Sequence, residues 1–356
     1  MTMKRLFYFL VLLLLAVQIT TAQLEVSEKS SAETSDSFFQ DQNSISMQLK
    51  FSTKDIKKNT NDSTYITSTL LIQNKERSWD SLKIKLRARG NHRRQNCYYA
   101  PLKVKLEKKA TIETMLEGTT KLKLVLPCLL QKDNNDLVLK EYMAYKLYEM
   151  ISPYHFKIRL ANIEFEEEIR SRIKKHNLKA ILIEDLDKVA ERHKGRAMTR
   201  KVHPLQQDDL ASLQNSFFQY LIGNTDFSIR GGHNQKLLFV DNKYVCIPYD
   251  FDMSGSGLVN APYAAVSGIE NLKSYATEVT QRVYKGYKRD DNLLQEVRQK
   301  YIASKVGIFA VIDDLEQFFQ NPSLFAEAKN YIDDFFEIME SDKKIEKYIV
   351  NRTRTK

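Results

Sequence analysis

The chain has few cysteines, the residues on which disulfide-linked and zinc-stabilised domains depend. Its 356 residues include three cysteines, Cys97, Cys128 and Cys246, too few and too widely spaced for a disulfide scaffold or a zinc cluster. At most one bridge can form, and three separate buried cysteines are the simplest prediction. The chain also lacks the GxxxxGK[ST] motif and has no internal repeat. These absences argue against the P-loop and solenoid classes.

Long apolar runs are equally scarce, and the one present lies at the amino terminus. Lys4 and Arg5 precede the apolar residues 6–17, and small residues including Ala22 follow. This order predicts a secretory signal peptide, residues 1–22, cleaved near Ala22 to leave a secreted or periplasmic protein. A membrane anchor is the alternative, but the run is shorter than the roughly 20 residues that span a bilayer. With no cysteine near the cleavage site to carry a lipid, we expect no membrane partner after cleavage.

The chain is basic, with a formal net charge of +10. Cleavage removes Lys4 and Arg5 and no acid, so the mature charge is +10 − 2 = +8. Such a charge favours anionic partners. The basic residues are nevertheless spread along the sequence and do not interleave with aromatic residues, so we expect no nucleic-acid partner. Solvated basic faces are the simpler explanation of the charge.

Two regions of different periodicity follow the signal peptide and a polar lead-in. Residues 23–43 lack periodicity and predict a flexible segment. Residues 44–185 alternate apolar with polar side chains, which predicts a β-rich amino-terminal lobe, with a helix at 136–152. Residues 186–356 repeat apolar side chains at threes and fours, which predicts a helical carboxy-terminal lobe. The expectation is a monomeric α+β protein with a ligand held between its lobes.

Acidic and amide side chains flank one predicted β-hairpin of the second lobe. Asp226 and Asn234 precede the hairpin, residues 235–248, and Asp250 and Asp252 follow it. Paired strands lie about 5 Å apart, so the two flanking loops should meet. Carboxylates that share a small space repel one another unless a cation neutralises them. The pattern therefore predicts a site for a hard metal ion.

Two interpretations of this group are open. Asn234 and Asp250 could ligate Mg²⁺ through oxygen while Asp226, kept off the metal, accepts a proton from a hydroxyl, as in a phosphotransferase. Alternatively, Asn224, Asp226 and Asp250 cap helices and turns, as Asn and Asp commonly do. The sequence YDFD favours a metal site, because its two acids share one side at the end of a buried strand.

A second group of polar residues lies in the amino-terminal lobe. The run RARGNHRRQN contains a tight turn at Arg89, Gly90 and Asn91, which could bind phosphates through backbone NH groups and guanidinium forks. An exposed hairpin tip is the alternative. Lys103 and Lys105 lie on the next strand and point to the same face, so one of them could reach a phosphate, and Glu141 could pair with such a lysine. A solvated strand face and a surface glutamate are the corresponding alternatives.

Several short motifs resemble, in order and spacing, those of the CotH kinase family of spore-coat proteins. The similarity is greater to the secreted CotH-like proteins of Bacteroidetes and covers about residues 79–286. The motifs are RGNH at 89–92, PLKVKL at 101–106, LKEYMAYKLY at 139–148, LIED at 182–185, IGNTDF at 222–227, PYDFDMSG at 248–255 and RVYKG at 282–286. Spore-coat members usually read DRH followed shortly by Asn, whereas here FSIRGGH separates Asp226 from Asn234.

The resemblance implies a bilobed, atypical protein-kinase-like fold that binds ATP with Mg²⁺ or Mn²⁺. It implies transfer of the γ-phosphoryl group to Ser or Thr of an unknown protein acceptor; the alternative is an inactive kinase-fold protein that binds or assembles at a surface. The implied catalytic residues are Asp226 and Lys103. The implied metal ligands are Asn234, Asp250 and Asp252. The implied nucleotide contacts are Arg89, Gly90, Asn91, Lys103, Glu141 and Glu184.

Overall fold

The computed structural model describes residues 37–90, 92–131, 133–252, 258–259 and 281–355. The predicted signal peptide and Asn91 lie outside the described residues. None of the helices in these ranges is long and apolar enough to cross a membrane. The described end of the lead-in is packed, since Phe38 and Phe39 are buried against the barrel core. Arg159 holds this segment by donating to the Phe38 carbonyl at 2.9 Å. Ordered packing thus begins before residue 44.

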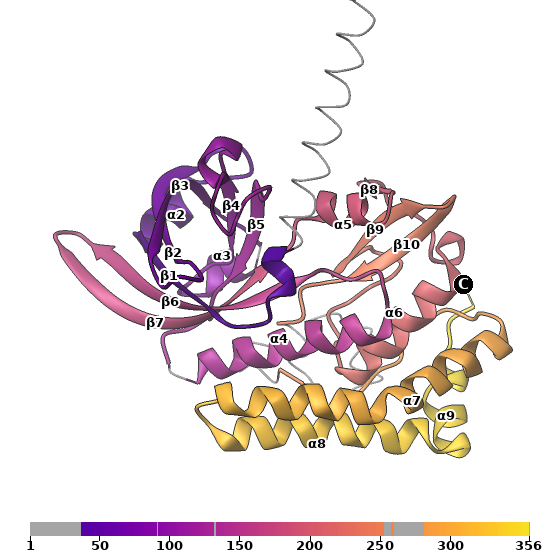
Figure 1. Ribbon diagram of the computed structural model, residues 1–356. Coiled ribbons are helices and arrows are strands. Elements are labelled where there is room, and N and C mark those ends of the chain that lie inside the picture. Colours follow the sequence, from indigo (N-terminus) through magenta and orange to yellow (C-terminus); the bar gives the residue numbers. More distant parts are fainter. Residues whose placement is uncertain (1–36, 91, 132, 253–257, 260–280, 356) are drawn as a thin grey trace, which may run out of the picture.

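The amino-terminal strands close into a seven-stranded barrel (Figure 1), in the order β1-β2-β3-β4-β5-β7-β6. The strands are β1 (Ile45–Phe51), β2 (Ile66–Gln73), β3 (Trp79–Ala88), β4 (Leu102–Leu106), β5 (Lys121–Val125), β6 (Ile158–Ile169) and β7 (Arg172–Ile183). Alternate residues fill the interior, as Leu82, Ile84 and Leu86 do in β3. Closure comes from parallel pairing of β1 with β6, in which Ile45 faces Ala161. Two short helices, α2 (Thr53–Asn59) and α3 (His92–Asn96), accompany the barrel.

The prediction of a bilobed protein-kinase-like fold is therefore wrong, although the mixed α+β content is present. The alternation in residues 44–185 identified strands with one buried face, but it could not show that the first strand meets β6 and closes the sheet. The charged stretch 166–179 forms the outer part of the long β6–β7 hairpin, which projects beyond the barrel in Figure 1.

Helices and a small sheet make up the rest of the molecule. The sheet has the order β10-β9-β8. The helices are α4 (Asn134–Ile151), α5 (Leu186–Arg192), α6 (Asp209–Leu221), α7 (Asp291–Leu315), α8 (Pro322–Met339) and α9 (Asp342–Tyr348). The strands are β8 (Arg196–Met198), β9 (Gln235–Val240) and β10 (Lys243–Pro248). Figure 1 shows α4 between the barrel and the pair α7 and α8. The predicted helical periodicity of the carboxy-terminal half is confirmed.

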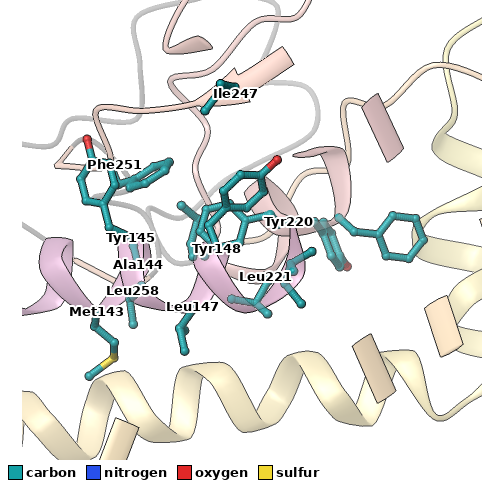
Figure 2. Packing of buried hydrophobic residues seen from close by; sticks show 14 of the residues in the cluster. Met143, Ala144, Tyr145, Leu147, Tyr148, Tyr220, Leu221, Ile247, Phe251 and Leu258 are labelled. Carbon is teal, nitrogen blue, oxygen red and sulfur yellow. The ribbon is translucent and has the colours of Figure 1, made fainter. Parts of the chain in front are cut away.

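Helix α4 links the apolar core to the segment that follows β10. Figure 2 shows the ring of Tyr145 from α4 beside that of Phe251, with ring centroids 4.5 Å apart. Phe218 of α6 packs edge-on against Phe251, with ring centroids 5.3 Å apart. Burying one phenyl side chain is worth about 1.5–3 kcal/mol. The aromatic anchor therefore fixes the residues on either side of Phe251, which are Asp250 and Asp252.

One disulfide was not predicted. Cys97 follows α3, Cys128 follows β5, and their sulfurs are joined, with Cα atoms 4.6 Å apart. The two residues are 31 positions apart, so nothing local in the sequence indicated the pair. The expectation of three separate cysteines holds for Cys246, which is free and buried.

Candidate functional site

The β9–β10 hairpin brings its two flanking loops together as the sequence predicted. At the closed end, Asp241 and Asn242 have φ angles of 46° and 60°, the combination that a two-residue type I′ turn requires. At the open end, the Tyr249 amide donates to the Asn234 carbonyl at 3.2 Å. Asn234 and Asp250 therefore lie side by side. Both have positive φ, 54° and 65°, a backbone conformation that is costly outside glycine and that concentrates at functional sites.

The loop before Asn234 returns to its own starting point. Ser228 and His233 pair through two backbone hydrogen bonds of 3.2 and 3.0 Å, so the extra residues form a tight turn. Asn234 consequently lies beside Asp226, and its Nδ2 donates to the Asp226 carboxylate Oδ2 and to the Asp226 carbonyl, both at 3.1 Å. The longer spacing between Asp226 and Asn234 does not separate them.

His233 joins the same carboxylate. Its Nε2 lies 3.3 Å from Oδ2 of Asp226. This hydrogen bond is the main reason why the pKa of His233 is raised, and the Asp250 carboxylate adds to the effect. Asp226 and Asp250 thus act on one imidazole. The sequence interpretation assigned His233 no role, although its place directly before Asn234 was the available signal.

The RVYKG motif forms hydrogen bonds with the backbone of the loop that carries Asp226. Lys285 is buried, and its Nζ donates to the carbonyls on either side of Asp226, those of Thr225 and of Phe227, the latter at 3.1 Å. Burial lowers the pKa of Lys285 to about 8. Arg282 donates from Nε to the Tyr220 carbonyl at 3.1 Å, at the end of α6. The motif therefore fixes the backbone that presents Asp226.

Asp250 is positioned through its backbone, which leaves its carboxylate available. Its amide donates to the Tyr145 hydroxyl at 3.0 Å, and Phe251 is anchored directly after it. The Asp250 carboxylate is partly exposed and, within the described ranges, makes no hydrogen bond or ion pair. It is thus open to a ligand.

The barrel carries a row of cations, one of which is near this carboxylate. Arg87, Lys103 and Lys123 are cross-strand neighbours on the outer face of β3, β4 and β5, and Asp250 acts on the pKa of Lys123. Like charges directly opposite one another destabilise a sheet. Arg87 already pairs with Asp62 at 2.7 Å, so an anionic ligand would explain the placement of Lys103 and Lys123 alone. Lys105 pairs in the same way with Lys85 and Lys121.

Lys123 lies near enough to Asp250 for the carboxylate to act on its pKa. Its pKa is lowered to about 7, chiefly by burial and next by Arg89, while the carboxylates of Asp185 and Asp250 oppose the shift. Its Nζ lies 4.4 Å from the ring centroid of Phe156. The sequence interpretation chose its neighbour Lys103. Period-two alternation places both lysines on the same face, so it could not distinguish them.

Glu141 pairs with an arginine, whereas the sequence suggested Lys103. Its Oε2 lies 3.8 Å from an Arg93 guanidinium nitrogen, and Arg93 Nε lies 3.4 Å from Oδ2 of Asp252. All three side chains are buried. Burial, followed by the nearby Asp252 carboxylate, raises the pKa of Glu141 well above its usual value. In the part of the chain that the structure covers, Oε1 of Glu141 has no hydrogen-bond partner.

The other predicted nucleotide contacts are distributed differently. Arg89 lies near Lys123 and Glu141, close enough to shift the pKa of each. Gly90 has φ +78° and is exposed, with open space around it. The Glu184 carboxylate is occupied within the chain, since its Oε2 accepts from the Lys157 amide and from Arg192, both at 3.0 Å. A nucleotide contact at this position would therefore have to use the backbone.

Within this group, a magnesium ion fits Asp250, which is partly exposed, better than Asp252, which is buried. Among the described residues, no three His, Cys, Asp or Glu side chains converge on a metal-sized point. Mg²⁺ is usually held by one or two carboxylates together with phosphates and waters. Asp250 and Oδ1 of Asn234 suit that pattern, whereas Asp252 faces Arg93.

No protein-family model and no curated protein sequence matches the chain. The resemblance to the CotH kinase family stays a prediction.

Proposed function

We propose that this protein transfers the γ-phosphoryl group of ATP to a Ser or Thr hydroxyl of a protein, with Mg²⁺ or Mn²⁺. One observation carries the proposal: Asp226, Asn234 and Asp250 meet at the open end of one hairpin, and Lys123 on the barrel is close enough to Asp250 for that carboxylate to act on its pKa. Proton acceptor, metal ligands and phosphate-binding cation are the parts that phosphoryl transfer needs. The proposal rests on this site and requires no kinase-like fold.

Asp226 is suited to accept the proton of an incoming hydroxyl. Hydrogen bonds from Asn234 and His233 orient its carboxylate. Its side chain nevertheless keeps 23% of its surface exposed, so a substrate hydroxyl can reach it. Because Lys285 fixes the flanking carbonyls, the carboxylate is held in place before substrate arrives, which is how a positioned base gains its effect.

The remaining residues would hold the phosphates and the metal. Asp250 and Oδ1 of Asn234 would bind the ion, which when bound neutralises charge on the phosphate oxygens. Lys123 and Arg89 supply positive charge from the barrel side. The buried Arg93 contacts Glu141 of α4 and Asp252, and so fixes the segment that carries Asp250.

The test uses the purified mature protein with labelled ATP, Mg²⁺ or Mn²⁺ and a mixture of Ser- and Thr-containing proteins. We expect Asp226→Asn to keep nucleotide binding but to lose transfer by about 10²–10⁴-fold, the usual contribution of a positioned base. We expect Asp250→Asn to lose metal-dependent nucleotide binding, seen as loss of the thermal shift that ATP and metal produce. Asp241→Asn is the matched control, because it makes the same change at the closed end of the same hairpin.

Two results would contradict the proposal. If wild type neither binds nucleotide nor incorporates label above the Asp250→Asn background, the site is not a phosphotransferase centre. If wild type binds ATP and metal but transfers nothing under any condition, the protein is an inactive nucleotide-binding protein, the alternative that the sequence left open.

A further inference from the structure

A large groove borders the loop that carries Asp226. Its volume is about 940 Å³, near the upper end for ligand pockets. Its lining includes Phe227, Ser228 and Arg230, which lie within four residues of Asp226 in the sequence. It also includes Lys285 and the carboxy-terminal residues Arg352 and Arg354. Because the lining includes Phe227, the neighbour of Asp226, a chain lying in this groove would pass next to the loop that carries Asp226.

The groove is strongly cationic. Six of its lining side chains are basic and two, Asp334 and Glu337, are acidic. Glu337 is already paired with Lys344 at 3.0 Å. Arg230, Arg352 and Arg354 are exposed and, as far as the described chain shows, make no ion pair with an acid. The surplus of positive charge is thus available to a partner.

A charge of the groove and the charge of Asp226 act on the same side chain, Lys285. The positive charge of Arg354 lowers the pKa of Lys285, and the negative charge of Asp226 opposes that shift. Lys285 also donates to the Phe227 carbonyl, and Phe227 lines the groove. The cations therefore lie beside the site of the proposed transfer and do not form a remote patch.

We infer that this groove binds an acidic, extended protein segment and places a Ser or Thr within that segment beside Asp226. The inference concerns the acceptor of the proposed phosphoryl transfer and rests on that function for its reaction, although binding itself can be measured without it. Charge complementarity selects the occupant: flanking Asp and Glu side chains would pair with Arg230, Arg352 and Arg354.

The experiment uses three fluorescein-labelled peptides of about ten residues, each with a central Ser. The flanking residues are Glu in the first, Lys in the second, and Gly with Ala in the third. A single-stranded oligonucleotide of matched negative charge is the fourth probe. Binding is measured by fluorescence anisotropy at low and high salt, and transfer as kcat/KM with ATP and metal. The test variant reverses two charges of the groove, Arg230→Glu with Arg354→Glu. The control variant makes an equal change of charge in the barrel half of the chain, Lys54→Glu with Lys75→Glu.

We expect the Glu peptide to bind and to react roughly tenfold better than the neutral one, since exposed ion pairs contribute modestly and add up. Salt should reduce the advantage. The double reversal should abolish it and favour the Lys peptide, whereas the barrel control should keep it. Equal binding and kcat/KM for the three peptides, or equally tight binding of the oligonucleotide, would overturn the inference.

The two proposals fail separately. Transfer to all peptides without charge preference refutes the acidic-acceptor inference and leaves phosphoryl transfer intact. Charge-selective binding of the Glu peptide without any transfer supports the groove as a binding site and refutes the reaction.

Discussion

Lys123 should titrate far below an ordinary lysine in the free protein, and nucleotide binding should reverse that shift. Its pKa is lowered from 10.5 to about 7, with burial as the main cause and Arg89 as the next. Between these two values the unfolded chain binds more protons at this side chain than the folded chain does, so its titration makes stability rise with pH. A bound triphosphate would favour the charged form and draw a proton onto Lys123.

The magnitude follows from the pKa. With a value of about 7, roughly one Lys123 in eleven is protonated at about pH 8. If ATP requires the charged form, its affinity should fall about eightfold between about pH 7.5 and about pH 8.5. Lys123→Arg keeps its charge at every pH in this range, so its affinity should stay nearly constant. Lys285, whose pKa is about 8, is present in both proteins, so its titration contributes equally to their two pH profiles.

The assay is isothermal titration calorimetry with ATP and Mg²⁺ in buffers of different ionisation enthalpy, which reports proton uptake directly. Wild type should take up nearly one proton per ATP at about pH 8 through Lys123, and Lys123→Arg should take up less by that amount. Identical pH profiles for the two proteins would refute the reasoning. So would an NMR titration that places the Lys123 ammonium near 10.5 in the free protein.

Three further predictions concern the framework of the site. Replacing Cys97 and Cys128 by Ser should lower the free energy of unfolding by about 3–4 kcal/mol, from the chain entropy of a loop of 31 residues; an unchanged denaturant midpoint would contradict this. Asp226→Asn should return the pKa of His233 toward 6.5 in an NMR titration, because the hydrogen bond that raises it is weakened; in wild type this bond stabilises the fold at low pH and is lost as pH rises through the raised pKa. Lys285→Met should lower kcat without changing the affinity for ATP, since it frees the loop around Asp226 and leaves the phosphate-binding cations in place; an equal fall in affinity would place Lys285 in the nucleotide site instead.

Local chemistry was sufficient to predict the elements that carry the candidate site. The hairpin of residues 235–248 could be recognised because β-branched and aromatic residues flank Asp241 and Asn242, which tolerate the positive φ of a tight turn. The same local pairing places Asn234 opposite Tyr249 and so beside Asp250. The association of Asp226, Asn234 and Asp250 followed from chain connectivity over a few tens of residues, which a sequence displays directly.

Tertiary structure alone decided how the strands close and which cations face the acids. Parallel pairing of Ile45 with Ala161 joins segments more than a hundred residues apart, and alternation looks the same in an open sheet and in a closed barrel. Lys103 and Lys123 likewise share one face by periodicity, and only the position of β5 brings Lys123 to Asp250. The sequence by itself determined which residue types flank the hairpin. The placement of the barrel relative to that hairpin, which depends on contacts between distant segments, determined their partners.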